Sequence, residues 1–322
     1  KDVLLEENYL NKTNLLGDIS LRLAIKNHLA INRNINVSEN QIIIGSGMEM
    51  IENILPLCNI NNITLENPGY HKLEYLFKNK NYSIKYQDLD NEGVIPPKER
   101  TILYTTPFNQ FPTGIKMTIS RKKELADFGI KTNSYIIEDD FDAEFRINGS
   151  PTTSIISLIP NNVIFFSTFS TTLFPGLRIA YIILPFDLIN KYTEKYKYYS
   201  NTVPTLNQIS LARFISEGYY ATYLNKKKRE YLRKRNLIIN QLNQLNIPVD
   251  EKRNYLSLVI KLDIKDHNEF KEKLKKEKIR IYSYTDYDKY EKESNYYLLG
   301  YTSIDDDKLL EGINKLNELR NC

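Results

Sequence analysis

The chain has 322 residues, of which 41% are hydrophobic and 26% charged, the balance of a globular protein large enough to form two lobes. Its 44 basic and 40 acidic residues are well mixed and leave a net charge of +4. This small net charge gives no electrostatic reason to expect a nucleic-acid or membrane partner. Cys58 and Cys322 lie far apart, which argues against a disulfide framework or a metal site and is typical of a cytoplasmic protein.

The first residues favour an extended arm over 1–16, too charged for a signal peptide, and no apolar run is long enough to span a bilayer. Because the chain does not begin with Met, we expect it to be a piece of a longer protein. Apolar residues at helical spacing predict a helix over 23–29, in which Arg22 and His28 would be solvated. Residues 41–51 then read as strand, glycine turn and helix, whose free N–H groups suit a phosphate.

The middle of the chain alternates strands with helices, as parallel-sheet proteins do. Strands are predicted over 62–66 and 101–106, and a helix over 120–131 with Ser120 as its cap. A buried strand from Tyr135 then leads into four closely spaced carboxylates, Glu138, Asp139, Asp140 and Asp142. Such carboxylates repel one another unless they are paired or bind a positive group.

The strand over 163–166 is followed by a turn rich in Ser and Thr, then Arg178 and a second strand over 179–184. Hydroxyls and an arginine at a strand end suit an oxyanion such as a phosphate. After Pro185 we expect helices, including 206–217 and a basic run over 226–235 that is more often a solvated helix face than a nucleic-acid contact. The last third predicts strands over 256–262, 279–282 and 296–302, with helices over 267–276 and 305–319.

Three segments together carry a resemblance to a known family: FPTG (111–114), IEDDFDAEFR (137–146) and TLFPGLR (172–178). They resemble the fold-type I pyridoxal-phosphate (PLP) enzymes, in the version found in MocR-type transcription regulators. The resemblance implies an α/β fold with an N-terminal arm and first helix (1–30), a large lobe with a mostly parallel seven-stranded sheet (31–200), and a connector helix with a small α+β lobe (201–322). The N-terminal arm would join the small lobe.

The resemblance also implies a cofactor site. Gly47, Met48 and Glu49 would hold the phosphate through their main chain, together with Thr168, Ser170 and Arg178. Tyr70 would stack on the pyridine ring, Asp139 would hold the ring nitrogen protonated, and Asn109 would hydrogen-bond a ring hydroxyl or substrate. Thr171 stands where the family carries its Schiff-base lysine, Phe141 where it carries a tyrosine, and Leu298 where transaminases hold a carboxylate with arginine. A hydroxyl cannot form an imine, so PLP or pyridoxamine phosphate would be bound without a covalent link.

Three functions remain open. The chain could be the effector-sensing, dimerising domain of a MocR/GntR-type regulator, binding PLP or a PLP–amino-acid adduct without an internal aldimine, with a winged-helix DNA-binding domain upstream of Lys1. Its effector would be an amino acid or a B6 vitamer. It could instead be a PLP-dependent aminotransferase whose lysine was replaced by engineering, or a pseudoenzyme scaffold that binds no cofactor.

Overall fold

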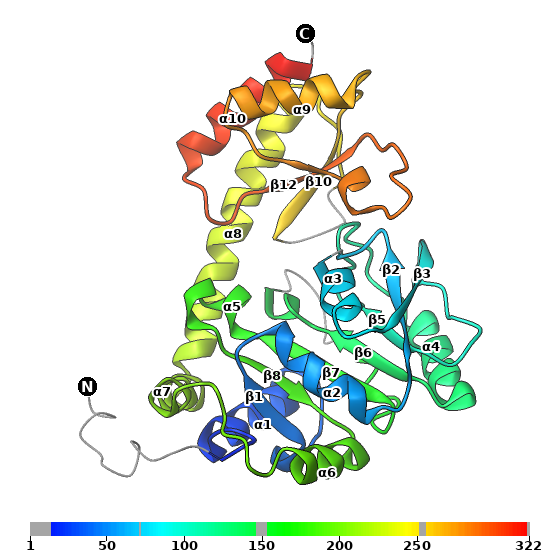
Figure 1. Ribbon diagram of the computed structural model, residues 1–322. Coiled ribbons are helices and arrows are strands. Elements are labelled where there is room, and N and C mark those ends of the chain that lie inside the picture. The colour runs from blue at the N-terminus through cyan, green and yellow to red at the C-terminus, as the bar shows by residue number, and fades with distance from the viewer. Residues whose placement is uncertain (1–13, 71, 146–152, 251–255, 321–322) are drawn as a thin grey trace.

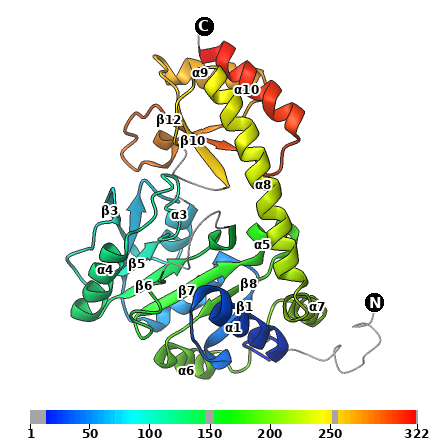
Figure 2. The ribbon, with the colours of Figure 1, turned by 180° about the vertical axis from the view of Figure 1, so that it is seen from behind.

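Figure 1 shows the computed structural model, which describes residues 14–70, 72–145, 153–250 and 256–320. Most of the predicted N-terminal arm lies outside the described residues, as do Arg146 and Cys322. The chain forms a large lobe and a smaller one, which the long helix α8 (Tyr219–Gln244) connects (Figures 1 and 2). In the part of the chain that is described, no helix has both the length and the apolar character of a membrane span.

The large lobe is built on an eight-stranded sheet in the order β1-β8-β7-β6-β5-β2-β3-β4. Its centre is parallel, whereas β8 runs antiparallel to both of its neighbours and β4 antiparallel to β3. The predicted mostly parallel sheet is confirmed, and the two-residue β4 adds an eighth strand at its edge. The strands are β1 Ile42–Gly45, β2 Asn62–Asn67, β3 Ser83–Asp90, β4 Gly93–Val94, β5 Ile102–Thr105, β6 Tyr135–Asp139, β7 Val163–Thr168 and β8 Ala180–Ile183.

Helices cover both faces of this sheet, which explains why central strands such as β7 and β8 consist mainly of buried apolar residues. In β7, Val163 and Phe165 join the core with α1, α4 and α7, whereas Ile164 and Phe166 join the core with α2, α3 and α6. The alternation follows from the two-residue period of a strand. The helices are α1 Ile19–Arg33, α2 Ile51–Ile54, α3 Lys72–Lys78, α4 Ile119–Thr132, α5 Phe169–Thr172, α6 Phe186–Lys195 and α7 Thr205–Ser216.

The small lobe has a four-stranded antiparallel sheet in the order β11-β12-β10-β9, with its own hydrophobic core. The second half of α8 belongs to that core, whereas Tyr220 and Leu224 near its start belong to the large lobe. The lobes therefore divide within α8 and not at residue 201, and α1 packs in the large lobe. The remaining elements are β9 Val249–Asp250, β10 Ser257–Lys261, α9 His267–Lys276, β11 Tyr282–Ser283, β12 Tyr296–Gly300 and α10 Asp306–Arg320.

Three local predictions need correction. Helix α1 begins at Ile19 behind the cap Asp18, and Arg22 is buried because its guanidinium donates to the carbonyl oxygens of Gly17 and Glu39. Helix α4 is capped by Thr118, whose hydroxyl accepts from the Arg121 N–H, and not by Ser120. The strand predicted over 279–282 is reduced to β11.

Candidate functional site

A cavity of about 300 Å³ lies at the carboxyl ends of β6 and β7, where open parallel sheets bind their ligands. The residues that line it all come from the large lobe: Gly47, Met48, Tyr70, Tyr104, Thr106, Phe111, Asp139, Phe141, Phe166, Thr168, Ser170 and Arg178. Most of the predicted site residues are therefore brought together. Glu49, Asn109 and Thr171 are not among the lining residues.

The Asp139 carboxylate ends β6 and is buried, with 4% of its surface exposed. Its Oδ2 accepts a hydrogen bond from the Tyr104 hydroxyl, and its Oδ1 has no partner among the described residues. Burial raises the pKa of Asp139 to about 8, because a charge is poorly solvated there, although the Tyr104 hydrogen bond opposes this shift. Near neutral pH the carboxyl therefore carries a proton, and it faces a ligand-sized space with one oxygen unused.

The neighbouring carboxylates each have their own partner. Asp140 makes a two-pronged ion pair with Arg33 of α1, at 2.5 and 2.7 Å, and both side chains are buried. Glu138 accepts hydrogen bonds from the Ser154 hydroxyl and from two backbone N–H groups. Asp142 accepts from Asn109 Nδ2 at 2.8 Å, and Glu144 Oε1 lies 3.0 Å from His28 Nε2.

These contacts correct the prediction for His28 and show the surroundings of Asn109. His28 is not solvated, since it lies in the partly buried contact with Glu144. Asn109 is buried and is not among the residues that line the cavity; its Nδ2 donates to Asp142, whereas its Oδ1 has no partner among the described residues.

The polar residues of the cavity lining also include Arg178, Thr168 and Ser170. The Arg178 guanidinium is exposed and approaches Glu49, with 3.4 Å between Nη2 and Oε2. Thr168 caps α5 by accepting from the Ser170 N–H at 3.1 Å, which fixes the start of the turn that carries Ser170. The cavity lining thus combines a buried carboxyl with a guanidinium and hydroxyl groups.

Thr171 lies in the middle of α5, between Ser170, which lines the cavity, and Thr172, which is buried. Two tyrosines of helix α8 bind this turn: the Tyr220 hydroxyl donates to Thr172 Oγ1 at 3.1 Å, and the Tyr223 hydroxyl donates to the Leu173 carbonyl oxygen at 3.4 Å. The turn that carries Thr171 is therefore bonded directly to the helix connecting the lobes.

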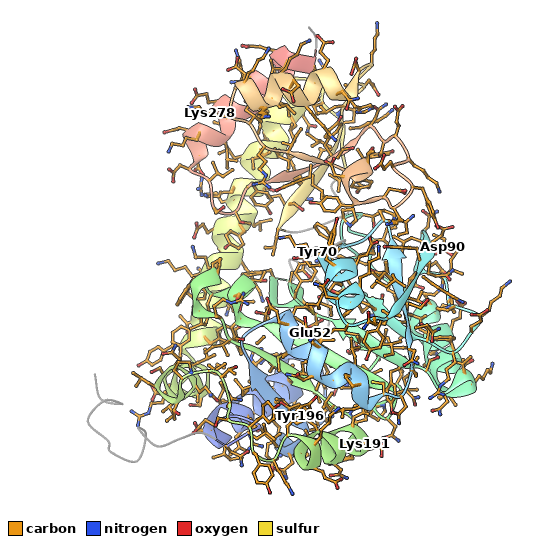
Figure 3. All side chains as sticks on the ribbon, in the orientation of Figure 1. Glu52, Tyr70, Asp90, Lys191, Tyr196 and Lys278 are labelled. Carbon is orange, nitrogen blue, oxygen red and sulfur yellow. The ribbon has the colours of Figure 1, made fainter. Side chains whose placement is uncertain are left out.

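Aromatic rings form the rim between the lobes. Tyr70 lies at the edge of the large lobe that faces the small lobe (Figure 3) and makes an edge contact with Phe111, at 6.0 Å between ring centroids. Phe111 in turn contacts Tyr287 of the small lobe at 4.7 Å. The buried Glu66 ties the loops beneath them together, because it accepts hydrogen bonds from Thr106 and Gln110.

Sequence reasoning missed Tyr104, Thr106, Phe111 and Phe166 as lining residues. Tyr104 and Phe166 belong to strands that were predicted as buried, and nothing in their spacing distinguishes a cavity wall from ordinary core. Phe111 begins the FPTG segment and Thr106 precedes it, and Pro112 and Gly114 indicate a turn there but not its direction.

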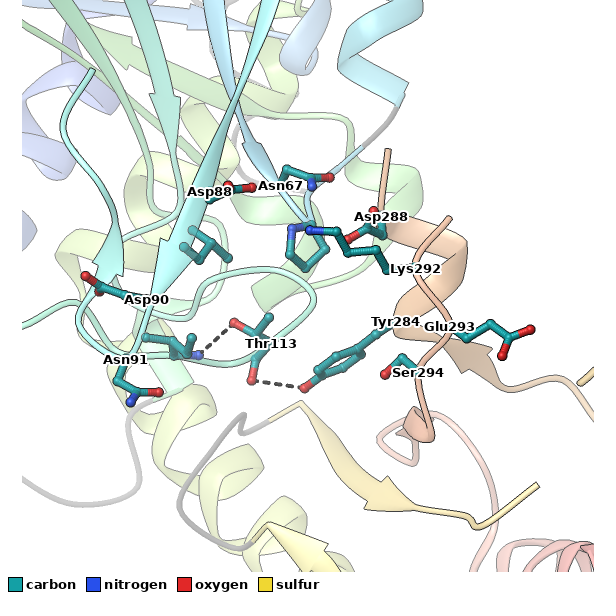
Figure 4. Close-up of a pocket in the computed structure, with 13 residues that line it drawn as sticks. Asn67, Asp88, Asp90, Asn91, Thr113, Tyr284, Asp288, Lys292, Glu293 and Ser294 are labelled. Atoms are coloured by element: carbon teal, nitrogen blue, oxygen red, sulfur yellow. Dashed lines mark hydrogen bonds between the residues drawn. The ribbon is translucent and has the colours of Figure 1, made fainter. Parts of the chain in front are cut away.

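A separate hollow of about 520 Å³ lies where the small lobe meets the loops after β2 and β3 (Figure 4). Its walls carry Asp88, Asp90, Asp288, Lys292 and Glu293, and the Tyr284 hydroxyl bridges the lobes by donating to the Thr113 carbonyl oxygen at 3.2 Å. None of the predicted site residues lines it.

The residues of the first cavity fit a phosphorylated pyridine. Asp139 offers a ring nitrogen its unpaired Oδ1, and Arg178 offers a phosphate a charge-assisted donor. The lining also contains four aromatic side chains, those of Tyr70, Phe111, Phe141 and Phe166. When such a phosphorylated pyridine is bound in an enzyme, it supplies an electron sink for reactions of amino acids. Thr171 provides no amine to attach it.

The chain belongs to the aminotransferase class I and II family, which matches residues 10–287. A solved archaeal alanine:glyoxylate aminotransferase superposes with a TM-score of 0.87 at 22% identity, covering 99% of this chain and 85% of the other, which establishes the shared fold.

The similar curated proteins include transcription regulators. The uncharacterized HTH-type transcriptional regulator YdeL of Bacillus subtilis (strain 168) is 33% identical over 313 residues, covering 94% of this chain and 68% of the relative. The probable rhizopine catabolism regulatory protein MocR of Rhizobium meliloti is 28% identical over 232 residues, covering 70% of this chain and 47% of the relative. The chain thus spans about two thirds of the first regulator, and the match to the second covers about half of that protein.

Proposed function

We propose that this chain is the effector-sensing, dimerising part of a MocR/GntR-type transcription regulator, and that it binds PLP, pyridoxamine phosphate or a PLP–amino-acid adduct without a covalent link. The observation that carries the proposal is that Asp139, buried with one oxygen unused, and Arg178 line the same cavity. The similarity to HTH-type regulators supports the regulatory role, and DNA would be bound by an upstream winged-helix domain.

The chain's own residues would act as follows. Asp139 carries a proton near neutral pH and shares it with a ring nitrogen, so that one proton lies between the two groups. Tyr104 holds Asp139 Oδ2 and thereby keeps Oδ1 directed to the ligand. Arg178, Ser170 and the Gly47 backbone receive the phosphate, and Tyr70 and Phe111 cover the side that faces the small lobe.

The main alternative, a working aminotransferase, is supported by the shared fold, but Thr171 stands against it because a hydroxyl cannot take the place of the reacting amine. The third possibility, a scaffold that binds no cofactor, differs in one measurable respect, since it would bind no B6 vitamer. Sequencing upstream of Lys1 for a winged helix separates the regulator from the aminotransferase.

Titration of the protein with pyridoxamine phosphate tests the proposed site. Arg178→Ala should weaken binding about tenfold to a hundredfold, because a charge-assisted hydrogen bond contributes about 1.5–3 kcal/mol. Arg229→Ala is the matched control, since Arg229 is exposed on α8 and its Nε donates to the Asn225 carbonyl oxygen of the same helix. Equal affinity of the wild type and Arg178→Ala would remove Arg178 from the site, and no binding to either would favour the empty scaffold.

A further inference from the structure

Glu49 and Arg178 meet beside Gly47, and both Gly47 and Arg178 line the cavity. Besides the 3.4 Å approach of Arg178 Nη2 to Glu49 Oε2, both groups crowd the open side of Gly47. A Cβ atom at Gly47 would lie 2.4 Å from Glu49 Oε2 and 2.5 Å from Arg178 Nη2. The carboxylate of the chain itself therefore occupies the space beside the guanidinium that the proposed function assigns to a phosphate.

The backbone on both sides brings these groups together. A short turn, η4 (Met48–Met50), begins directly after Gly47 and returns the Glu49 side chain toward it. Arg178 has φ 49° and ψ 46°, a left-handed conformation that is uncommon for a residue with a side chain. Backbone conformations of this kind concentrate at binding and catalytic sites, where the surrounding structure holds them in place.

We propose that the Glu49 carboxylate is a built-in competitor for the anion that Arg178 binds, and that it limits how strongly the site prefers a phosphorylated ligand over its unphosphorylated form. This inference rests on the proposed function. A phosphate monoester carries about 1.5 to 2 negative charges near pH 7, more than a carboxylate, so it can displace Glu49 from the guanidinium. Glu49 and Arg178 are 65% and 55% exposed, and a solvated pair of this kind shifts an equilibrium only about two- to fivefold.

The experiment measures the affinity for pyridoxamine phosphate and for pyridoxamine in the wild type and in Glu49→Gln, each with and without Arg178→Ala. Glu49→Gln should bind pyridoxamine phosphate about two- to fivefold more tightly and should bind pyridoxamine as the wild type does. In the Arg178→Ala background the gain should disappear, because the competition passes through the guanidinium. Glu52→Gln is the matched control: Glu52 lies on the adjoining α2 but pairs with Lys80 at 3.1 Å.

The outcomes separate this inference from the proposed function. If the wild type binds pyridoxamine phosphate through Arg178 but Glu49→Gln binds it equally or more weakly, the competitor role is wrong and the proposed site stands. A gain that persists in Arg178→Ala, or that is equally large for pyridoxamine, also overturns the competitor role. If no variant binds pyridoxamine phosphate at millimolar concentration, the proposed function fails and this inference fails with it.

Discussion

Each carboxyl group in the acidic run at the end of β6 has its own hydrogen-bond or ion-pair partner. Asp139 was predicted from the motif, but its partner Tyr104 is 35 positions away in the sequence, and Arg33 is 107 positions from Asp140. The sequence therefore indicated that the carboxylates needed partners, and only the fold identifies those partners. The contact between Asn109 and Asp142, 33 positions apart in the sequence, likewise becomes visible only in the fold.

The raised pKa of Asp139 predicts a pH dependence of stability. Because the folded protein keeps this proton up to about pH 8 and the unfolded chain loses it near the ordinary value of 3.8, the associated stability is complete below pH 4 and is lost as the pH rises to about 8. One extra bound proton gives a slope of about 1.4 kcal/mol per pH unit. Asp139→Asn should remove that slope in urea unfolding measured from pH 4 to pH 8.

Asp90→Asn is the control, because the pKa of Asp90 is shifted in the opposite direction to that of Asp139. The hydrogen bond from Arg121 lowers the pKa of Asp90, so its contribution is present above the ordinary value near 3.8 and is lost on acidification. Its removal should leave the slope between pH 4 and pH 8 unchanged. If Asp139→Asn has the same slope as the wild type, Asp139 is ionised in the folded protein at neutral pH.

The hydroxyl at position 171 predicts that the wild type forms no covalent adduct with PLP. After borohydride treatment, peptide mapping of the wild type should find no pyridoxyl group near residue 171. Thr171→Lys should gain one there, because the adjacent Ser170 lines the cavity, and its intact mass should rise accordingly. Thr171→Arg is the matched control, with a similar charge but no amine that can link. A folded Thr171→Lys without an adduct would indicate that this side chain does not reach the cavity.

At the scale of elements, the existence of the helices was easier to predict than the residues at which they begin and end. The predicted helix over 267–276 coincides with α9, whereas α1 is longer than its apolar spacing indicated. The reason lies in tertiary contacts: the last residue of α1, Arg33, is held by Asp140. The basic run on α8 is likewise used within the fold, since Arg233 pairs with Asp306 at 2.6 Å and Lys234 donates to the Ile304 carbonyl oxygen at 2.6 Å.

The ion pair between Arg33 and Asp140 joins α1 to the end of β6, and its loss should be costly. Arg33→Ala leaves a buried carboxylate without its guanidinium, which typically costs about 3–5 kcal/mol in the free energy of unfolding. Lys26→Ala, on the same helix, removes a partly exposed pair with Glu39 and should cost less than about 1 kcal/mol. Urea unfolding of both variants measures the difference, and equal small losses would contradict a structural role for the buried pair.

At the scale of the molecule, the alternation of strands and helices was sufficient to predict the α/β class. The lobe boundary was not predictable, because α8 continues the same helical pattern from one core into the other. The cavity was located from the motifs, but its aromatic rim depends on Phe111 meeting Tyr287, two residues from different lobes.

We predict that the protein is a homodimer in solution, as the resemblance to fold-type I proteins implies. Large apolar side chains are exposed on α1, on α6 and after α6, where a partner could cover them. These residues are Ile19, Ile31, Phe186, Tyr198 and Tyr199. Light scattering at micromolar concentration should give twice the chain mass of 37.8 kDa. A single-chain mass under those conditions would contradict the prediction.

Helix α8 is a lever with one end fixed at the site. Its 26 residues span about 39 Å at the helical rise of 1.5 Å per residue, and Tyr220 and Tyr223 bond its first turns to Thr172 and Leu173. Its far end lies in the core of the small lobe. For a rod of that length, a tilt of about 5° at the fixed end moves the other end by about 3 Å. A small rotation of the turn that contains Ser170 and Thr172 would therefore displace the whole small lobe.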